Sequence, residues 1–220
     1  MNEEENWAKT KSMLKSDQVA LGDYFSYQLR RTPRRTLFSL AYYKFAAKML
    51  QPNSRVLELG CGEGLGGCIL SESADSYHGV DLDSVMIDSA QSNFQEGDRS
   101  FETANVLGKQ FGSYDAVVSL DVIEHIVPEN DGLFWKTVSD NLGEKGVAVI
   151  GTPNITSQKY ASEVTRSGHI NLYDHKRMLE TASEWFEYCF MFSANDELVH
   201  TGFSPMAHYL MVLACGPKRG

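Results

Sequence analysis

A glycine-rich turn after one short apolar segment constrains the fold of this 220-residue chain more than any other feature. Residues 55–59 read Arg-Val-Leu-Glu-Leu, which is typical of a buried β-strand, and glycines follow at positions 60, 62 and 64. Because glycine has no Cβ, the backbone can turn tightly there and approach a ligand closely. The segment therefore predicts a strand, a ligand-binding turn and a helix, as at the start of many α/β domains.

Short β-prone segments then alternate with helical ones along the chain. The expected strands are residues 55–59, 77–81, 100–104, 114–120 and 147–151. The expected helices are residues 66–73, 85–94, 131–142 and 175–183. This alternation predicts βαβ units and hence an α/β fold with a Rossmann-like, doubly wound, mostly parallel sheet. Two further β-prone segments, residues 185–192 and 207–215, predict an antiparallel hairpin at the C-terminal end.

The first fifty residues have a different texture. Residues 19–29 and 37–50 are rich in aromatic and aliphatic side chains, with Thr32-Pro33 as a break, so we expect helices there. The chain thus divides into an N-terminal helical extension, residues 1–50, and a ligand-binding domain, residues 51–220. A helical extension of this kind can act as a lid that excludes water from the site.

Charge and cysteine usage limit the partners and the compartment. The formal net charge of −9 repels phosphate backbones, which argues against broad nucleic-acid binding. The four cysteines are scattered without a C-x-x-C pair, which favours a reducing compartment and no structural zinc. The acidic N-terminus lacks the apolar core of a signal peptide, and no apolar run approaches the ~20 residues of a membrane span. We expect a cytoplasmic protein, without membrane or nucleic-acid partners; the sequence is also compatible with a homodimer.

An acidic residue, Asp81, closes the second expected strand 17 residues after Gly64. A carboxylate at that position can accept two hydrogen bonds from ribose hydroxyls. Together with Glu58-x-Gly60-x-Gly62-x-Gly64, this pattern resembles the class I S-adenosylmethionine-dependent methyltransferases, over about residues 50–155. The NAD-binding pattern G-x-G-x-x-G differs, because the third glycine here comes one residue earlier.

The resemblance implies a Rossmann-like fold with S-adenosylmethionine as cofactor. Gly60 and Gly62 would line the methionine end, Asp81 would hold the ribose, and Leu82 would flank the adenine. Asn105 stands where the family often has an Asp near the adenine, and an Asn oxygen can accept the same hydrogen bond. The expected cofactor-binding residues are Glu58, Gly60, Cys61, Gly62, Gly64, Asp81, Leu82, Asn105, Val106 and Leu120.

A cluster of polar residues follows the fourth strand. If Asp121 begins a helical turn, Glu124 and His125 lie at i+3 and i+4 on the same face, at the carboxyl end of the sheet where ligands bind. The segment resembles the ubiquinone-biosynthesis O-methyltransferases and the small-RNA 3′-end 2′-O-methyltransferases, in which E-x-x-E-H holds a divalent ion. The RNA enzymes add a histidine after a T-P-N segment, and here His169 follows Thr152-Pro153-Asn154.

Three interpretations of this cluster remain open. The resemblance implies a metal set of Asp121, Glu124, His125 and His169, although Asp has a shorter arm than the family's Glu. A bound ion could then lower the pKa of an acceptor hydroxyl. Alternatively, His169 acts as a general base without metal, with Asp121 and His125 as further catalytic candidates, or the group is purely structural.

Two segments outside the shared core are expected to choose the acceptor. Residues 24–35 combine aromatics with four arginines, of which Arg30 and Arg34 are candidates to hold an anionic or sugar-like acceptor. The alternative is a plain basic helix surface. Residues 195–206 include His200 and form either a pocket wall or a simple hairpin loop.

These features lead to one main hypothesis and three alternatives. The main hypothesis is O-methylation, assisted by a metal ion or not, of a small hydroxylated acceptor such as a sugar or nucleotide-sugar. The alternatives are N-methylation of a small amine or amino sugar, 2′-O-methylation of RNA, and a non-catalytic cofactor-binding subunit.

Overall fold

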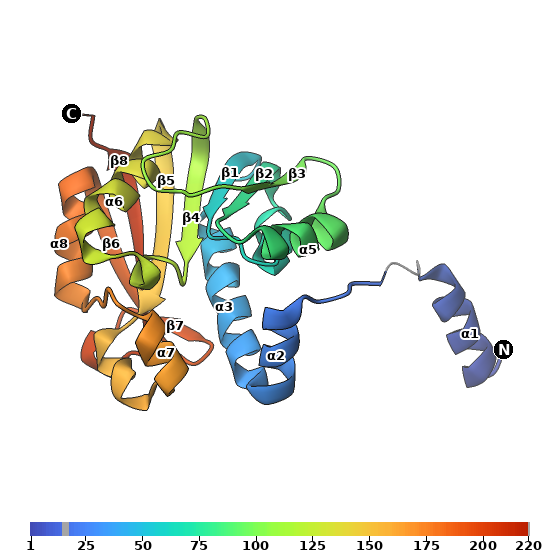
Figure 1. Cartoon of the computed structure of the whole chain (residues 1–220). Coiled ribbons are helices and arrows are strands. Elements are labelled where there is room, and N and C mark those ends of the chain that lie inside the picture. The colour runs from blue at the N-terminus through green and yellow to red at the C-terminus, as the bar shows by residue number, and fades with distance from the viewer. Residues whose placement is uncertain (15–17, 220) are drawn as a thin grey trace.

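The computed structural model describes residues 1–14 and 18–219, and its centre is one eight-stranded sheet in the order β3-β2-β1-β4-β5-β8-β6-β7 (Figure 1). The strands are β1 (Ser54–Leu59), β2 (Ala74–Asp81), β3 (Arg99–Thr103), β4 (Tyr114–Leu120), β5 (Leu142–Pro153), β6 (Phe186–Asn195), β7 (Leu198–His200) and β8 (Tyr209–Pro217). The first five strands are parallel, and the sheet has its switch point where β1 lies between β2 and β4. The predicted Rossmann-like, mostly parallel sheet is confirmed.

Helices cover both faces of the sheet. On one face lie α3 (Pro33–Met49), α4 (Leu65–Leu70) and α5 (Ser84–Phe94), and on the other lie α6 (Asp131–Asp140) and α8 (His175–Trp185). Residues of β1 alternate between the layers, since Val56 packs in the core under α3 and Leu57 in the core under α6. This two-sided burial explains why the strand is a continuous apolar run, as expected for a parallel sheet.

The C-terminal strands form the antiparallel hairpin that the sequence predicts. β8 inserts between β5 and β6 and is antiparallel to both of them. The connection from β6 to β8 is not a plain loop, because it contains β7 and a 3-10 turn, η4 (Ser204–Met206). β8 therefore lies inside the sheet and completes its core.

The N-terminal region contains α1 (Glu3–Met13), α2 (Asp23–Arg31) and α3. α1 lies apart from the body in Figure 1 and has no buried residue. α2 and α3 form a helical hairpin at Thr32-Pro33, where Pro33 occupies the first turn of α3, a position that tolerates its missing N–H. The C-terminal half of α3 belongs to the main core, since Ala46 is fully buried there.

The remaining segments connect β4 to α8 at the carboxyl ends of the parallel strands. They are η1 (Ile123–His125), η2 (Pro128–Asn130), η3 (Ile155–Tyr160) and α7 (Glu163–Gly168). None of the helices in the described part of the chain combines the length and apolar character that a membrane crossing requires.

Candidate active site

A cavity of about 540 Å³ opens at the carboxyl ends of β1, β2 and β4, next to the switch point of the sheet. This is where ligands bind in open α/β sheets, and the volume lies within the usual range of ligand pockets. The lining residues come from α2 and α3, the glycine turn, the end of β2 and the segments after β3 and β4. They are Tyr24, Phe25, Ser39, Tyr43, Gly60, Cys61, Gly62, Glu63, Asp81, Leu82, Met86, Asn105, Val106, Leu107, Leu120, Asp121, Val122, His125, Ile126, Val127 and Asn130.

The glycine turn has backbone conformations that favour glycine. Gly60 has φ +81° and Gly62 has φ +53°, both in the left-handed region. A Cβ on Gly60 would lie 2.2 Å from Cγ2 of Val122, whereas a Cβ on Gly62 would meet nothing closer than Sδ of Met86, at 3.8 Å. Gly60 is therefore needed for both conformation and space, and Gly62 mainly for conformation.

Asp81 lies at the end of β2 beside the glycine turn. One carboxylate oxygen accepts a hydrogen bond from the Gly62 N–H at 2.9 Å, and the other accepts from the Asp83 N–H at 2.9 Å. Each carboxylate oxygen can accept more than one hydrogen bond, so both remain available to ribose hydroxyls. The second strand and the glycine turn are thus held together around the expected ribose position.

The expected adenine side is formed by Leu82, Asn105 and Val106, all of which line the cavity. Leu82 is 71% exposed, so its apolar surface is open to a ligand. The side-chain oxygen of Asn105 already accepts a hydrogen bond from the Leu107 N–H at 3.0 Å. Asn105 therefore shapes the turn after β3. An adenine amino group would have to share the Asn105 side-chain oxygen with the Leu107 N–H.

Two of the expected cofactor-binding residues do not line the cavity but support it from behind. Glu58 is fully buried and accepts hydrogen bonds from the hydroxyls of Tyr43, at 2.7 Å, and Tyr77. Burial raises the pKa of Glu58 to about 7. Gly64 has φ +81°, and a Cβ there would lie 2.8 Å from Cβ of Ala90, so Gly64 allows α4 and α5 to pack closely.

Asp121 lies directly after β4 in a left-handed backbone conformation, with φ +58°. Its N–H is shared between the carbonyl of Gly151 at 3.1 Å and the hydroxyl of Tyr209 at 3.1 Å. These bonds hold a conformation that costs a non-glycine residue about 1 kcal/mol or more. The side chain faces the cavity, where surrounding protein desolvates it and raises the pKa of this carboxyl.

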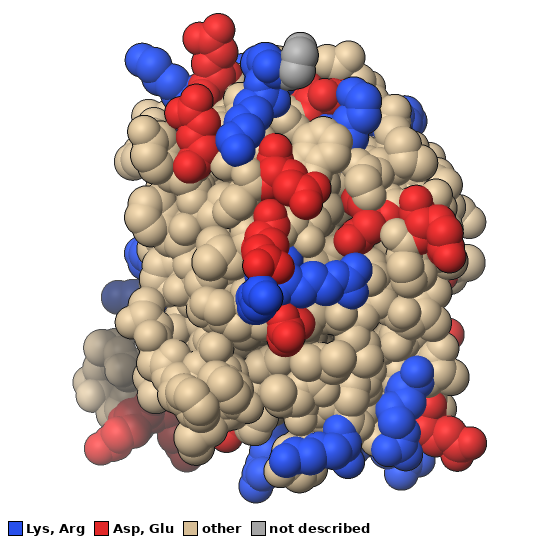
Figure 2. Space-filling model, turned by 90° about the vertical axis from the view of Figure 1, so that its left-hand side faces the viewer, with Lys and Arg blue, Asp and Glu red and all other residues tan. Residues whose placement is uncertain are grey.

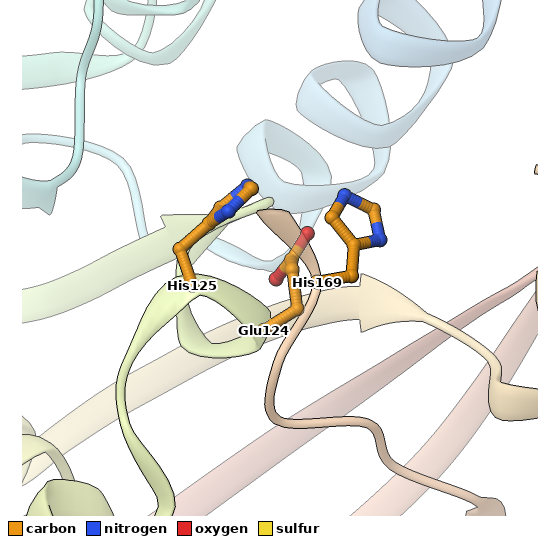
Figure 3. A group of neighbouring side chains, drawn as sticks. All are labelled: Glu124, His125 and His169. Carbon is orange, nitrogen blue, oxygen red and sulfur yellow. The ribbon is translucent and has the colours of Figure 1, made fainter. Parts of the chain in front are cut away.

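Glu124, His125 and His169 form a compact group beside the cavity (Figure 3). One ligand atom from each lies within 4.8 Å of the others. Glu124 is fully buried; its Oε2 accepts a hydrogen bond from Thr152 at 3.0 Å, and its Oε1 has no partner in the described part of the chain. Nδ1 of His125 lies 2.9 Å from the carbonyl of Gly168, which leaves Nε2 of this ring free.

The neutral form of His169 suits a cation. Desolvation, followed by repulsion from His125 and Arg35, lowers the pKa of His169 to about 4, so its ring is neutral at pH 7. Burial, followed by repulsion from Asp121, raises the pKa of Glu124 well above its ordinary value, so a cation that binds this carboxyl must displace its proton. Asp121 is not part of this group within the described residues, so three of the four expected metal ligands come together.

The residues expected to bind the acceptor are placed away from the cavity. Arg30 and Arg34 are exposed and are not among its lining residues. His200 lies at the end of β7, where Nε2 is 2.7 Å from Oδ1 of Asn195 and Nδ1 accepts from the Gly202 N–H at 3.0 Å. Both ring nitrogens of His200 are thus engaged within its own hairpin.

Sequence analysis did not single out Arg35. It lies on the helical stripe of α3 that continues through Ser39 and Tyr43, two residues that line the cavity. The Arg35 side chain is exposed and has no hydrogen bond or ion pair among the described residues, and its charge helps to lower the pKa of His169. The i, i+4, i+8 spacing was the signal that could have selected this arginine.

The glycine turn, Asp81 at the end of β2 and the cavity between them are those expected of a Rossmann-like S-adenosylmethionine-dependent methyltransferase. A family model described as a methyltransferase domain matches residues 27–193. The chain therefore belongs to this methyltransferase domain family, and S-adenosylmethionine is its cofactor.

Individual relatives agree with this assignment. The chain is 28% identical over 130 residues to the ubiquinone biosynthesis O-methyltransferase of Azorhizobium caulinodans, a match that covers 56% of this chain and 51% of that relative. The matched part is thus about half the length of that enzyme. This similarity includes one of the two O-methyltransferase groups that the sequence resembles.

Solved structures share the fold. A TehB-like SAM-dependent methyltransferase from Corynebacterium glutamicum superposes with a TM-score of 0.63 at 20% identity, over 87% of this chain and 98% of that one. The N-methyltransferase NodS from Bradyrhizobium japonicum, in complex with S-adenosyl-L-homocysteine, gives 0.59 at 16% identity, over 96% and 98%. At these identities the likeness extends to the fold and no further.

Proposed function

We propose that this methyltransferase acts on a hydroxyl oxygen of a small acceptor, and that a divalent cation held by Glu124, His125 and His169 assists the transfer. The observation that carries the proposal is the buried, unpartnered Oε1 of Glu124 next to two imidazole rings. A buried carboxylate oxygen without a hydrogen-bond partner is costly, and a cation would satisfy it.

The donor set fits a metal ion. Two imidazoles and one carboxylate from η1 and the segment after α7 are typical ligands of zinc, iron and related divalent ions. The contact of His125 with the Gly168 carbonyl fixes the orientation of its ring, as partners of metal-binding histidines commonly do. When bound, the ion would lower the pKa of a hydroxyl and favour its alkoxide at neutral pH.

The other residues of the site position the reactants. S-adenosylmethionine supplies an electrophilic methyl group when it lies along the glycine turn, and Asp81 holds its ribose. The acceptor would enter between that methyl group and the cluster, under Arg35 and the aromatic residues of α2. The positive charge of Arg35 would attract an acceptor with an anionic group, such as a carboxylate or a phosphate. Because the sulfonium is a strong electrophile, orientation of the acceptor oxygen supplies much of the acceleration.

The face that carries α6 and α8 supports a small acceptor more than a nucleic acid. Figure 2 shows acidic and basic side chains intermingled over the side that carries α6 and α8. On these helices Lys176 pairs with Glu180, and Arg177 pairs with Asp131. Binding along a nucleic-acid backbone requires a stretch of unpaired cations, and the acidic net charge of the chain opposes it as well.

Metal binding tests the proposal directly. Calorimetric titration of the metal-free protein with Mn²⁺, Co²⁺ and Zn²⁺ should show one site, and His169→Ala and Glu124→Gln should each weaken it by about 10-fold to 100-fold. His200→Ala is the matched control, because this histidine is committed to its hairpin. Undiminished metal affinity in both site variants would contradict the metal assignment.

The acceptor atom needs a separate experiment. Transfer of labelled methyl from S-adenosylmethionine to matched acceptors, one with a hydroxyl and one with an amine on the same skeleton, should favour the hydroxyl, and chelator should abolish this transfer. If the methyl group is instead transferred to the amine, and chelator does not affect this transfer, the protein is an N-methyltransferase and the proposal is wrong.

A further inference from the structure

The glycine turn contains a buried acidic residue, Glu63, that the transfer reaction does not require. It stands between Gly62 and Gly64 and is only 4% exposed. Its Oε1 accepts a hydrogen bond from the Tyr24 N–H at 2.8 Å, and its Oε2 accepts from the Phe25 N–H at 3.2 Å. The carboxylate thus reaches across to the first turn of α2, 38 and 39 residues earlier in the chain.

This contact supplies a helix cap that α2 lacks. The residue before α2 is Gly22, which has no side chain to bond the free N–H groups of the first turn. Glu63 takes that role from a distant part of the chain, and its negative charge also favours the positive end of the helix dipole. A Cβ on Gly22 would lie 2.5 Å from Oε1 of Glu63, so glycine is what leaves room for the carboxylate.

The residues held by Glu63 line the cavity. Tyr24 and Phe25 both line the cavity, and Phe25 is buried. A second tether lies just before them, where the Ala20 N–H donates to Oδ1 of Asn93 at 2.8 Å and Nδ2 of Asn93 donates to the Ala20 carbonyl at 3.0 Å. The start of the lid is therefore attached both to α5 and to the loop that binds the cofactor.

We propose that Glu63 is a positioning residue that couples occupation of the glycine turn to closure of α2 over the cavity. The backbone of Glu63 lies within the turn that a cofactor contacts, while its side chain holds α2. In this arrangement of the turn, both carboxylate oxygens meet the two N–H groups of α2. A ligand that stabilises this arrangement must stabilise the closed lid, and the closed lid must retain the ligand by the same factor.

This coupling has a consequence for the release of the product. The demethylated product would lie under the closed lid, so it would leave after the lid opens. Slow release of the product is a common consequence of such closure.

Hydrogen exchange of the α2 amides tests the coupling without any acceptor. In the wild-type chain, S-adenosylhomocysteine should slow exchange in a peptide that contains residues 23–31. In Glu63→Gln this protection should fall about tenfold, with a similar loss of S-adenosylhomocysteine affinity, because a charged acceptor is lost. Glu72→Gln is the matched control, because Glu72 is exposed and its side chain makes no hydrogen bond among the described residues.

Gly22→Ala provides a second variant that leaves the glycine turn unchanged. It should produce the same loss of protection, since the added methyl displaces the carboxylate. Circular dichroism and thermal unfolding would establish that each variant folds. The proposal is overturned if S-adenosylhomocysteine protects α2 equally in the wild type and in either variant, or fails to protect it in the wild type. Either result would leave the metal-assisted O-methylation untouched, because no acceptor or metal enters the measurement.

Discussion

The three glycines of the glycine turn are required for different physical reasons, although they form one sequence motif. Gly60 is confined by Val122, Gly62 faces open space, and Gly64 is confined by packing behind the cavity. The side chain of Glu63, which stands between Gly62 and Gly64, accepts hydrogen bonds from the first turn of α2. A motif of alternating glycines therefore combines one position set by space, one by backbone conformation and one by packing.

The difference between Gly60 and Gly62 predicts an asymmetric pair of variants. Gly60→Ala should weaken S-adenosylhomocysteine binding by about tenfold or more, because both a clash and a left-handed conformation must be accommodated. Gly62→Ala should weaken S-adenosylhomocysteine binding less, since only the left-handed backbone conformation is unfavourable for alanine there. Trimming the neighbour in a Gly60→Ala, Val122→Ala double variant should recover part of the affinity. Titration calorimetry measures all of these, and equal losses for both single variants with no recovery would disprove the assignment.

At the level of elements, α2 and α3 are part of the site while α1 is not. α1 buries no residue, whereas α2 contributes Tyr24 and Phe25 to the cavity and α3 contributes Ser39 and Tyr43. The lid expected from residues 1–50 is therefore proposed to consist of α2 with the start of α3, and the rest of α3 supports the sheet.

Two truncations separate these elements. Removal of residues 1–17 should leave the affinity for S-adenosylhomocysteine and the melting temperature unchanged, because it removes no buried contact among the described residues. Removal of residues 1–31 should weaken the affinity by about tenfold, since it uncovers the cavity and leaves Glu63 without its two donors. Binding titrations and thermal melts of both proteins test this, and a marked loss in the shorter truncation would show that α1 has a role.

The whole molecule contains a carboxyl that should make its stability depend on pH. Glu58 is buried in the centre of the sheet, and its pKa of about 7 lies above the ordinary value of 4.5. The folded state therefore binds more protons than the unfolded state between pH 4.5 and 7, so this group makes the protein less stable as pH rises through that window. At about 1.4 kcal/mol per pKa unit, the contribution is about 3 kcal/mol.

Urea unfolding at pH 5 and pH 8 measures this effect. From pH 5 to pH 8 the free energy of unfolding should fall in both proteins, but by about 3 kcal/mol more in the wild type than in Glu58→Gln. The reason is that glutamine does not titrate. Glu96→Gln, which changes an exposed acid, should keep the wild-type difference. An unchanged pH dependence in Glu58→Gln would show that the buried carboxyl does not control it.

Features that depend on neighbouring residues could be predicted from the sequence, and features that depend on residues far apart in the chain could not. Tyr114–Leu120 was predicted as a strand at its observed bounds, and the fold class and cofactor followed from the glycines and Asp81. β5 is longer than expected, from Leu142 to Pro153, because its first part pairs with β4 after a shift in register. Such pairing depends on a partner strand and is invisible in the pattern of one segment.

The local sequence pattern was sufficient to predict the first strand, the glycine turn and the helix that follows. Backbone conformation and hydrophobic periodicity are properties of neighbouring residues. Contacts between distant residues appeared only in the folded chain. They include the cap that Glu63 provides for α2 and the placement of Arg35, rather than Arg34, on the stripe of α3 that continues to the cavity. One residue of helix turns a side chain by about 100°, so only the packing of α3 against the sheet decided which arginine shares that stripe.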